Sequence, residues 1–242
     1  MTGDFTHEAY RELLGAFLSR GYAVRGYDDA DPGARHLILR HDVDMSLQAA
    51  EAIADIENDL GVKGCYFVLV RTEMYNIFSA ASHHSLRRIG ELGHEIGLHL
   101  DASFYGNDVA LLEEAAAREC DILEGATGKP VTAISFHRPA ASLLDHDEPL
   151  AGRPHAYQHR YFKQMGYCSD SRGAWHHGHP LENEAVQQNR ALQLLTHPIW
   201  WSPGKAEHVQ SRLDRFARER YELLRQELGR NCTAYDPSQA EG

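Results

Sequence analysis

The stretch LILRHDVD, from Leu37 to Asp44, decides the fold: it begins with apolar residues and ends in His41, Asp42 and Asp44. A short apolar run of this kind predicts a buried strand. In an α/β barrel the carboxyl ends of the strands hold the active site, so a core strand that finishes in ionisable groups is expected to deliver them there. Asp42 and Asp44 are two residues apart, which places both on one side of an extended strand. Two close carboxylates repel unless a cation or a proton lies between them.

Strands and helices alternate around this stretch. Strands are expected at 37–42, 65–70, 94–101, 131–136, 166–169 and 191–196. Helices are expected after the caps Thr6 and Ser46, at 85–92, at 108–124 with Gly125 as its stop, and from Val209 to Leu228 near the end. Such alternation implies parallel pairing with right-handed crossovers. We therefore predict an α/β fold, a distorted (β/α) barrel of about seven strands, in a single domain over 1–242.

Composition narrows the classes of function. No apolar run in the 242 residues approaches the roughly 18 residues of a membrane span, and the start MTGDFTHEAYRELLG lacks the pattern of a secretory signal, so we expect a cytoplasmic protein with no membrane span. The net charge of -11 repels phosphate backbones and argues against a nucleic-acid partner. Four well-separated cysteines are expected as buried free thiols. The sixteen histidines indicate metal or proton chemistry, whereas composition predicts no oligomeric state.

Five expected strands end in the same kinds of residue. The strand ends read RHDVD, GLHLD, SFHRP, CSDS and LLTHP, and each contains Asp or His. Because all are carboxyl ends, they are expected on one face of the fold. His99, His137 and His197 are therefore expected beside Asp42 and Asp44, as metal ligands or proton carriers.

Assembled, these motifs resemble the NodB-like polysaccharide deacetylase superfamily (carbohydrate esterase family 4 and relatives), and within it a divergent WbmS-like branch associated with lipopolysaccharide O-antigen biosynthesis. LILRHDVD stands where the family has T-F-D-D, GHEIGLHLD at G-H-E-I-G-N-H-T, FHRP at F-R-P-P, SDSRGAW at D-x-x-x-W and LLTHP at L-x-H, so the resemblance covers about 37–201. It implies a distorted (β/α) barrel and a hydrolase that uses a metal ion to remove an acyl group, acetyl or formyl, from an amide nitrogen of a sugar or related small molecule.

The resemblance also implies a role for each matched residue. Asp42 would be the general base, Asp44 and His99 metal ligands, and His197 the general acid that protonates the leaving amine. Val43 separates two aspartates that are adjacent in the family. The roles of Asp42 and Asp44 are therefore open to exchange.

The family's second metal-binding histidine has no counterpart here. Ser103 stands at its position, and His137, or failing that Asp101, is expected to supply the third ligand. The family's arginine that orients the base is displaced to Arg138, which we expect near the substrate. The implied cofactor is a divalent ion, Zn²⁺ first, with Co, Mn, Ni or Fe as alternatives.

Three further residues complete the expected site. Asp170 is expected to orient a catalytic side chain. Trp200 and Trp201 are expected to form an apolar wall for a sugar face or an acyl methyl group.

The segment 137–162, rich in Pro and His, is expected as a loop over the barrel mouth. Within it, Arg153, His155 and His159 are expected to contact an anionic substrate.

Three alternative functions remain open at this point. A hydrolase of cyclic amides or other non-peptide C–N bonds would use the same groups. A non-catalytic carbohydrate-binding descendant would explain Ser103. A non-haem iron oxygenase would use two histidines and one carboxylate, such as His99, Asp101 and His137, although oxygenases with that spacing usually sit on jelly-roll sheets.

Overall fold

The computed structural model describes residues 5–106 and 108–239. It divides into two compact units, Met1–Lys205 and Ala206–Gly242. All seven strands lie in the first unit, which is an α/β fold as predicted, and the second contains the long helix α7 (Val209–Asn231). That one domain spans 1–242 stays a prediction.

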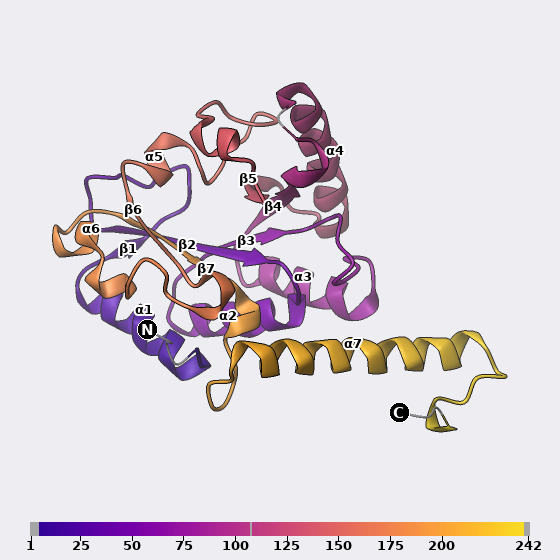
Figure 1. The fold of residues 1–242 in the computed structure, drawn as a ribbon. Coiled ribbons are helices and arrows are strands. Elements are labelled where there is room, and N and C mark those ends of the chain that lie inside the picture. Colours follow the sequence, from indigo (N-terminus) through magenta and orange to yellow (C-terminus); the bar gives the residue numbers. More distant parts are fainter. Residues whose placement is uncertain (1–4, 107, 240–242) are drawn as a thin grey trace. The chain divides into compact units, whose positions relative to one another are not determined.

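The seven strands form one parallel sheet (Figure 1). They are β1 (Ala23–Val24), β2 (His36–Val43), β3 (Cys65–Val68), β4 (Glu95–Asp101), β5 (Val131–His137), β6 (Gly166–Ser169) and β7 (Leu192–Thr196). Their order is β5-β4-β3-β2-β7-β6, and because β7 takes one edge of β2, β1 and β3 share the other. Within the described residues no ladder joins β5 to β6, so the predicted barrel is open there.

Helices supply the crossovers that parallel strands require. They are α1 (His7–Ser19), α2 (Leu47–Asp59), α3 (Ala80–Glu91), α4 (Val109–Thr127), α5 (His159–Phe162) and α6 (Glu184–Gln187). Thr6 and Ser46 cap α1 and α2 through their hydroxyl oxygens, as the sequence predicts. Several boundaries differ from the prediction. Helix α3 already begins at Ala80, and α4 continues through Gly125 to Thr127, where Gly128 with its φ of 65° ends the helix in the left-handed conformation. Strand β3 ends at Val68 and not at residue 70.

The core lies where apolar strands meet helix faces. Every residue of β3 and β7 is buried, as expected when both faces of a parallel sheet are covered. Helix α1 contributes Tyr10, Leu14 and Phe17, each at most 1% exposed. Three cysteines are buried thiols as predicted, whereas Cys232 is exposed, because the end of α7 leaves it outside any core.

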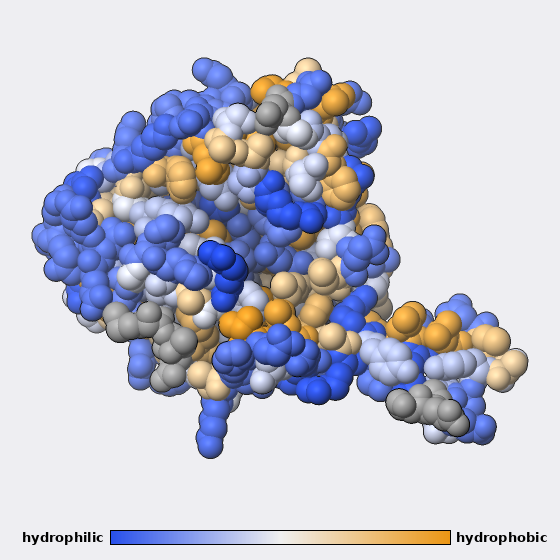
Figure 2. Space-filling model, in the orientation of Figure 1, coloured by the Kyte–Doolittle hydropathy of each residue, from blue (hydrophilic) through white to orange (hydrophobic). Residues whose placement is uncertain are grey.

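Polar side chains cover most of the face drawn in Figure 2, as expected from the composition. Helix α7 is an exception: its predicted stripe includes Leu224 and Leu228, and these side chains are 57% and 43% exposed. No helix among residues 5–106 and 108–239 combines the length and the hydropathy that a membrane crossing requires.

The segment after β5 packs along the open edge of the sheet. Ile134 of β5 accepts a hydrogen bond from Ala156 and donates one to Pro154, which fixes His155 with no exposed surface. Arg153 pairs with Glu124. The expectation that His155 and Arg153 contact an anionic substrate is therefore wrong, because His155 is fully buried and the guanidinium of Arg153 is already bound by Glu124 and two backbone carbonyls.

His155 makes stability depend on pH. Burial, together with the nearby charge of His146, lowers the pKa of His155 from 6.5 to about 4. Between these values the unfolded chain binds a proton that the folded chain does not. Stability should therefore be complete above about pH 6.5 and fall by about 2–3 kcal/mol as the pH drops towards 4.

Urea unfolding at several pH values tests this expectation. Wild type should lose more stability between about pH 7 and pH 4.5 than His155→Gln does, whatever the absolute stability of the variant. Equal losses in the two proteins would show that His155 does not carry the effect.

Candidate metal centre

The carboxyl ends of five strands meet in one place, as predicted. Asp44 follows β2, His99 lies in β4, His137 ends β5, and Asp170 and His197 follow β6 and β7. Parallel strands make this convergence unavoidable, since all of them point the same way.

Asp44, His99 and His137 form a cluster whose nitrogen and oxygen atoms lie within 4.8 Å of one another. Oδ1 of Asp44 is 3.1 Å from Nε2 of His99 and 3.4 Å from Nδ1 of His137. This oxygen is buried, and neither contact is aligned as a hydrogen bond, so within the described residues it has no hydrogen-bond partner. Burial by itself would raise the pKa of Asp44, but His137 and His99 lower it, and the group stays a carboxylate.

The hydrogen bonds around His99 place a proton on its Nδ1. Ser135 donates its one hydroxyl hydrogen to Oδ1 of Asp42 at 3.2 Å. The same hydroxyl lies 2.6 Å from Nδ1 of His99 and must therefore accept its N–H. Nε2 is then the nitrogen that faces Asp44, and in the neutral tautomer its lone pair and the carboxylate oxygen are two acceptors that a cation could join.

A cation between the three groups would satisfy both acceptors. Bonds of about 2.0–2.2 Å to a tetrahedral Zn²⁺ place its ligand atoms about 3.3–3.6 Å apart, close to the 3.1 and 3.4 Å found here. Asp44, His99 and His137 therefore fit a divalent cation, and His99 has the second hydrogen-bond partner that metal-bound histidines usually have.

Asp101, the other expected substitute for the missing histidine, is not part of this cluster. Ser103 donates to its Oδ1 at 2.6 Å, and Arg138 pairs with its other oxygen. Arg138 has a φ of 51°, a left-handed conformation that turns its side chain back towards Asp101. The three-group cluster therefore contains His137 and not Asp101.

Asp42 has a partner that the sequence analysis missed. Arg40 donates to its two carboxylate oxygens at 3.0 and 2.8 Å, and both side chains are buried. Burial would raise the pKa of Asp42, but the charge of Arg40 and the neighbouring His99 lower it, so it is ionised. The sequence spacing indicates this partner: Arg40, Asp42 and Asp44 lie at every second position, so their side chains point to the same side of an extended chain.

Asp170 holds His197 in one orientation, the arrangement expected for it. Its Oδ1 lies 2.7 Å from Nδ1 of His197 and also accepts the backbone N–H of that residue, while Oδ2 accepts the indole N–H of Trp201 at 2.9 Å. Burial would lower the pKa of His197, but the hydrogen bond to Asp170 and the surrounding carboxylates outweigh it and raise the pKa to about 9. Nε2 of His197 lies 3.9 Å from Asp44, beside the cluster.

For the amide hydrolysis that the sequence predicts, the Asp170→Asn variant should lower kcat by about 10–100-fold and change KM little. The amide keeps the shape of the carboxylate but not the charge that holds the proton on His197. Steady-state kinetics measures this split. Asp145→Asn removes an exposed carboxylate that pairs with Lys163 and is the matched control. An Asp170→Asn variant with the wild-type kcat would contradict the role given to Asp170.

One of the two tryptophans expected as an apolar wall belongs to the core. Trp201 is 3% exposed and packs edge-on against Phe5 and Tyr10, so its ring is not the apolar wall predicted from the sequence. Trp200, in the 3-10 helix η5 (Pro198–Trp200), is partly buried against the same core. His41 is turned away from Asp42 by the alternation of the strand.

A second buried network of polar side chains surrounds His41. Its Nε2 lies 2.8 Å from Glu57 and its Nδ1 2.7 Å from Thr196. Tyr10 and Tyr66 donate their hydroxyls to the same glutamate. Every donor in this group has an acceptor, which indicates a structural network between the sheet and α2.

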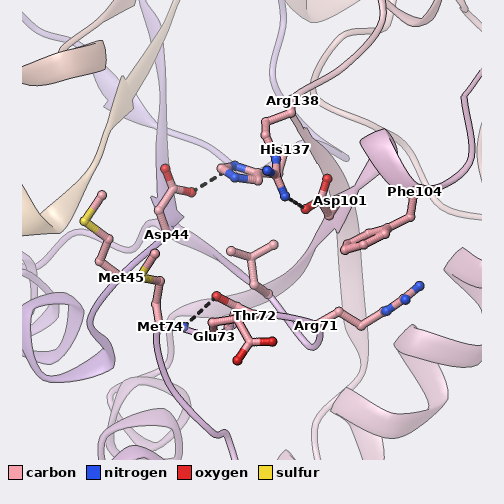
Figure 3. Close-up of a pocket in the computed structure, with 11 residues that line it drawn as sticks. Asp44, Met45, Arg71, Thr72, Glu73, Met74, Asp101, Phe104, His137 and Arg138 are labelled. Atoms are coloured by element: carbon pink, nitrogen blue, oxygen red, sulfur yellow. Dashed lines mark hydrogen bonds and ion pairs between the residues drawn. The ribbon is translucent and has the colours of Figure 1, made fainter. Parts of the chain in front are cut away.

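A cavity of about 510 Å³ opens beside the cluster (Figure 3). Asp44 and His137 line it, together with residues of the segments that follow β3 and β4. Met45, Met74 and Phe104 give it apolar surface, and Arg138 lies at its edge. This volume suits a ligand of the size of a sugar or other small molecule.

Comparisons with known proteins give distant structural likenesses. No family model matches the chain, and no curated protein matches it. A family 4 carbohydrate esterase from Bacillus anthracis is 15% identical, with 92% of this chain and 90% of that one covered and a TM-score of 0.45. IcaB from Ammonifex degensii is 14% identical (53% and 65% covered, TM-score 0.41), and the chitin deacetylase from the fungal pathogen Colletotrichum lindemuthianum is 17% identical (48% and 49% covered, TM-score 0.36).

This chain therefore spans about half of the chitin deacetylase chain and 65% of the IcaB chain. At such identities and scores, the assignment of roles rests on the geometry of this chain's own residues.

Proposed function

We propose that the chain is a metal-dependent hydrolase that removes an acetyl or formyl group from the amide nitrogen of a sugar or related small molecule. The observation that carries the proposal is the arrangement around Asp44. Two histidines share one buried oxygen of this carboxylate, with a separately held carboxylate, Asp42, and a separately held imidazole, His197, beside them.

Each residue has one task in this proposal. Asp44, His99 and His137 hold a divalent cation, with Zn²⁺ the first choice. When bound, such a cation polarises the scissile carbonyl and makes water more acidic. Asp42, kept ionised by Arg40, takes the proton of the attacking water, and His197, kept protonated by Asp170, gives a proton to the departing nitrogen. Amine and carboxylic acid leave as products.

The finer parts of the proposal rest on the sequence motifs. Their resemblance to a WbmS-like branch extends the proposal to lipopolysaccharide O-antigen biosynthesis, in the cytoplasm. The same groups could open a cyclic amide, since the chemistry at carbon and nitrogen is unchanged.

One observation favours an alternative. Asp44, His99 and His137 are two histidines and one carboxylate, the ligand set of non-haem iron oxygenases. The parallel α/β sheet and the proton-holding pair of His197 and Asp170 favour hydrolysis instead, because an oxygenase has no need for a general acid at that point. A binding-only descendant is disfavoured by His137, which supplies the group that Ser103 lacks.

The test is an assay of the purified chain, reconstituted in turn with Zn²⁺, Co²⁺, Mn²⁺, Ni²⁺ and Fe²⁺, on N-acetyl sugars, N-formyl sugars and cyclic amides. We expect release of free amine and acid without O₂, and a loss of about 10²–10⁴-fold in Asp42→Asn. Turnover that needs O₂ would support the oxygenase. Sugar binding without any hydrolysis, unchanged in Asp42→Asn, would overturn the proposal.

A further inference from the structure

The cavity beside the metal centre contains a cation that the proposed hydrolysis does not use. Arg71 follows β3 and lines the cavity together with Phe104 of η1 (Ala102–Phe104). Its guanidinium lies 4.2 Å from the centre of the Phe104 ring and donates to the hydroxyl of Tyr105 at 2.6 Å. Two aromatic side chains therefore fix the position of an otherwise exposed arginine.

The charge of Arg71 is not neutralised by direct contact. Among residues 5–106 and 108–239 no carboxylate oxygen lies within 4.0 Å of its guanidinium nitrogens, whereas Arg138 on the same cavity is paired with Asp101. Glu119 is reached only through Tyr105, whose hydroxyl lies 3.3 Å from it, and Glu73 lines the cavity as an exposed residue. Only one of the five N–H donors of Arg71 is engaged in a hydrogen bond within this part of the chain.

Arg71 and Phe104 lie across the cavity from Asp44 (Figure 3). A ligand that reaches from the metal centre to this side passes the half-exposed ring of Phe104, which is 55% exposed. The apolar face of a sugar packs on such a ring, and a guanidinium with free donors binds phosphate or carboxylate in a forked geometry.

We infer that Arg71, held over Phe104, is an anion subsite, and that the substrate is a sugar whose ring carries a phosphate or carboxylate group. This inference rests on the proposed function, because it places the sugar ring between the metal centre and Arg71. By this inference, charged sugars are preferred over neutral polymeric sugars, because the neutral ones offer Arg71 no charged partner.

Calorimetric titration of the full chain with glucose, glucose phosphate and glucuronate tests the subsite. None of these probes has an amide bond, so binding is measured whether or not the chain hydrolyses amides. We expect both anions to bind at least about tenfold more tightly than glucose, and Arg71→Gln to remove that advantage without changing glucose binding. If Arg71→Gln removes the advantage of only one of the two anions, the charged group of that anion, phosphate or carboxylate, is the one that Arg71 recognises.

Matched variants separate charge from structure. Arg71→Lys should keep part of the advantage, since it retains charge without the planar fork. Glu73→Gln should strengthen anion binding about two- to threefold by removing a nearby negative charge. Arg87→Gln, an exposed arginine of α3 that pairs with Glu91, should change nothing.

Equal affinities for glucose and the two anions in wild type would overturn the inference. So would an Arg71→Gln variant that loses glucose and the anions alike, because Arg71 would then only support the Phe104 ring. Hydrolysis of neutral N-acetyl sugars together with either result would leave the proposed hydrolase intact.

Discussion

The His99→Ala variant is expected to lose bound metal and to hydrolyse N-acyl sugars at no more than the background rate. Nδ1 of His99 is hydrogen-bonded to Ser135 and Nε2 faces Asp44 at 3.1 Å. The side chain is 1% exposed, so bulk water is not in place to act as a substitute ligand. Removal of a group next to a metal ligand costs about 10–100-fold in metal affinity, and removal of the ligand itself should cost more than that. Elemental analysis of protein purified without a histidine tag measures the metal, alongside kcat/KM.

Two companion variants decide which residue completes the cluster. His137→Ala should lose metal as His99→Ala does, whereas Asp101→Asn should retain it, because Asp101 is engaged by Ser103 and Arg138. His84→Ala removes an exposed imidazole and is the control for the loss of a histidine as such. Full metal content and full activity in His99→Ala would refute the metal site and, with it, the proposed function.

The Arg40→Met variant is expected to lose about 3–5 kcal/mol of stability, a large part of the 5–15 kcal/mol that a domain has. The substitution leaves the Asp42 carboxylate buried, with Ser135 as its remaining hydrogen-bond donor among the residues that the structure describes. Methionine fills much of the space of the arginine stem between the rings of Phe67 and Tyr157, so the loss reports the unpaired charge more than a cavity. Urea denaturation gives the free energy of unfolding.

The double variant Arg40→Met/Asp42→Asn provides the control for this prediction. With the carboxylate neutral, most of the stability lost in Arg40→Met should return, while hydrolysis stays low because the base is gone. A single variant that loses less than about 1 kcal/mol would show that water or another group reaches Asp42 and that Arg40 does not hold it.

Much of the fold follows from local pattern. The 3.6-residue period of α1 and the side-chain caps Thr6 and Ser46 act within a few residues, so they can be read along the chain. The direction of the strands follows from the alternation of strand and helix, and it alone brings Asp44, His99 and His137 to one end of the sheet. The α/β fold of seven strands is confirmed on this basis.

The pairing of side chains in the site depends on residues from other elements that lie opposite, and a local sequence pattern does not show which residues those are. Register places Asp101 beside His137 in the sheet, yet the left-handed backbone of Arg138 decides that Asp101 pairs with Arg138 and leaves His137 to Asp44. Likewise the packing of α1 decides that Trp201 lies in the core.

The stretch LILRHDVD shows which features the sequence determines and which only the tertiary structure determines. By itself the sequence determined that a buried parallel strand carries ionisable groups to its carboxyl end, because apolarity and alternation are properties of neighbouring residues. Only the tertiary structure decided that Arg40 is the partner of Asp42, that His41 belongs to the network of Glu57, and that Asp44 faces two histidines. The reason is physical: charge pairing inside a protein requires a partner across the space between elements, and that distance is set by the sheet register and by the packing of helices on it.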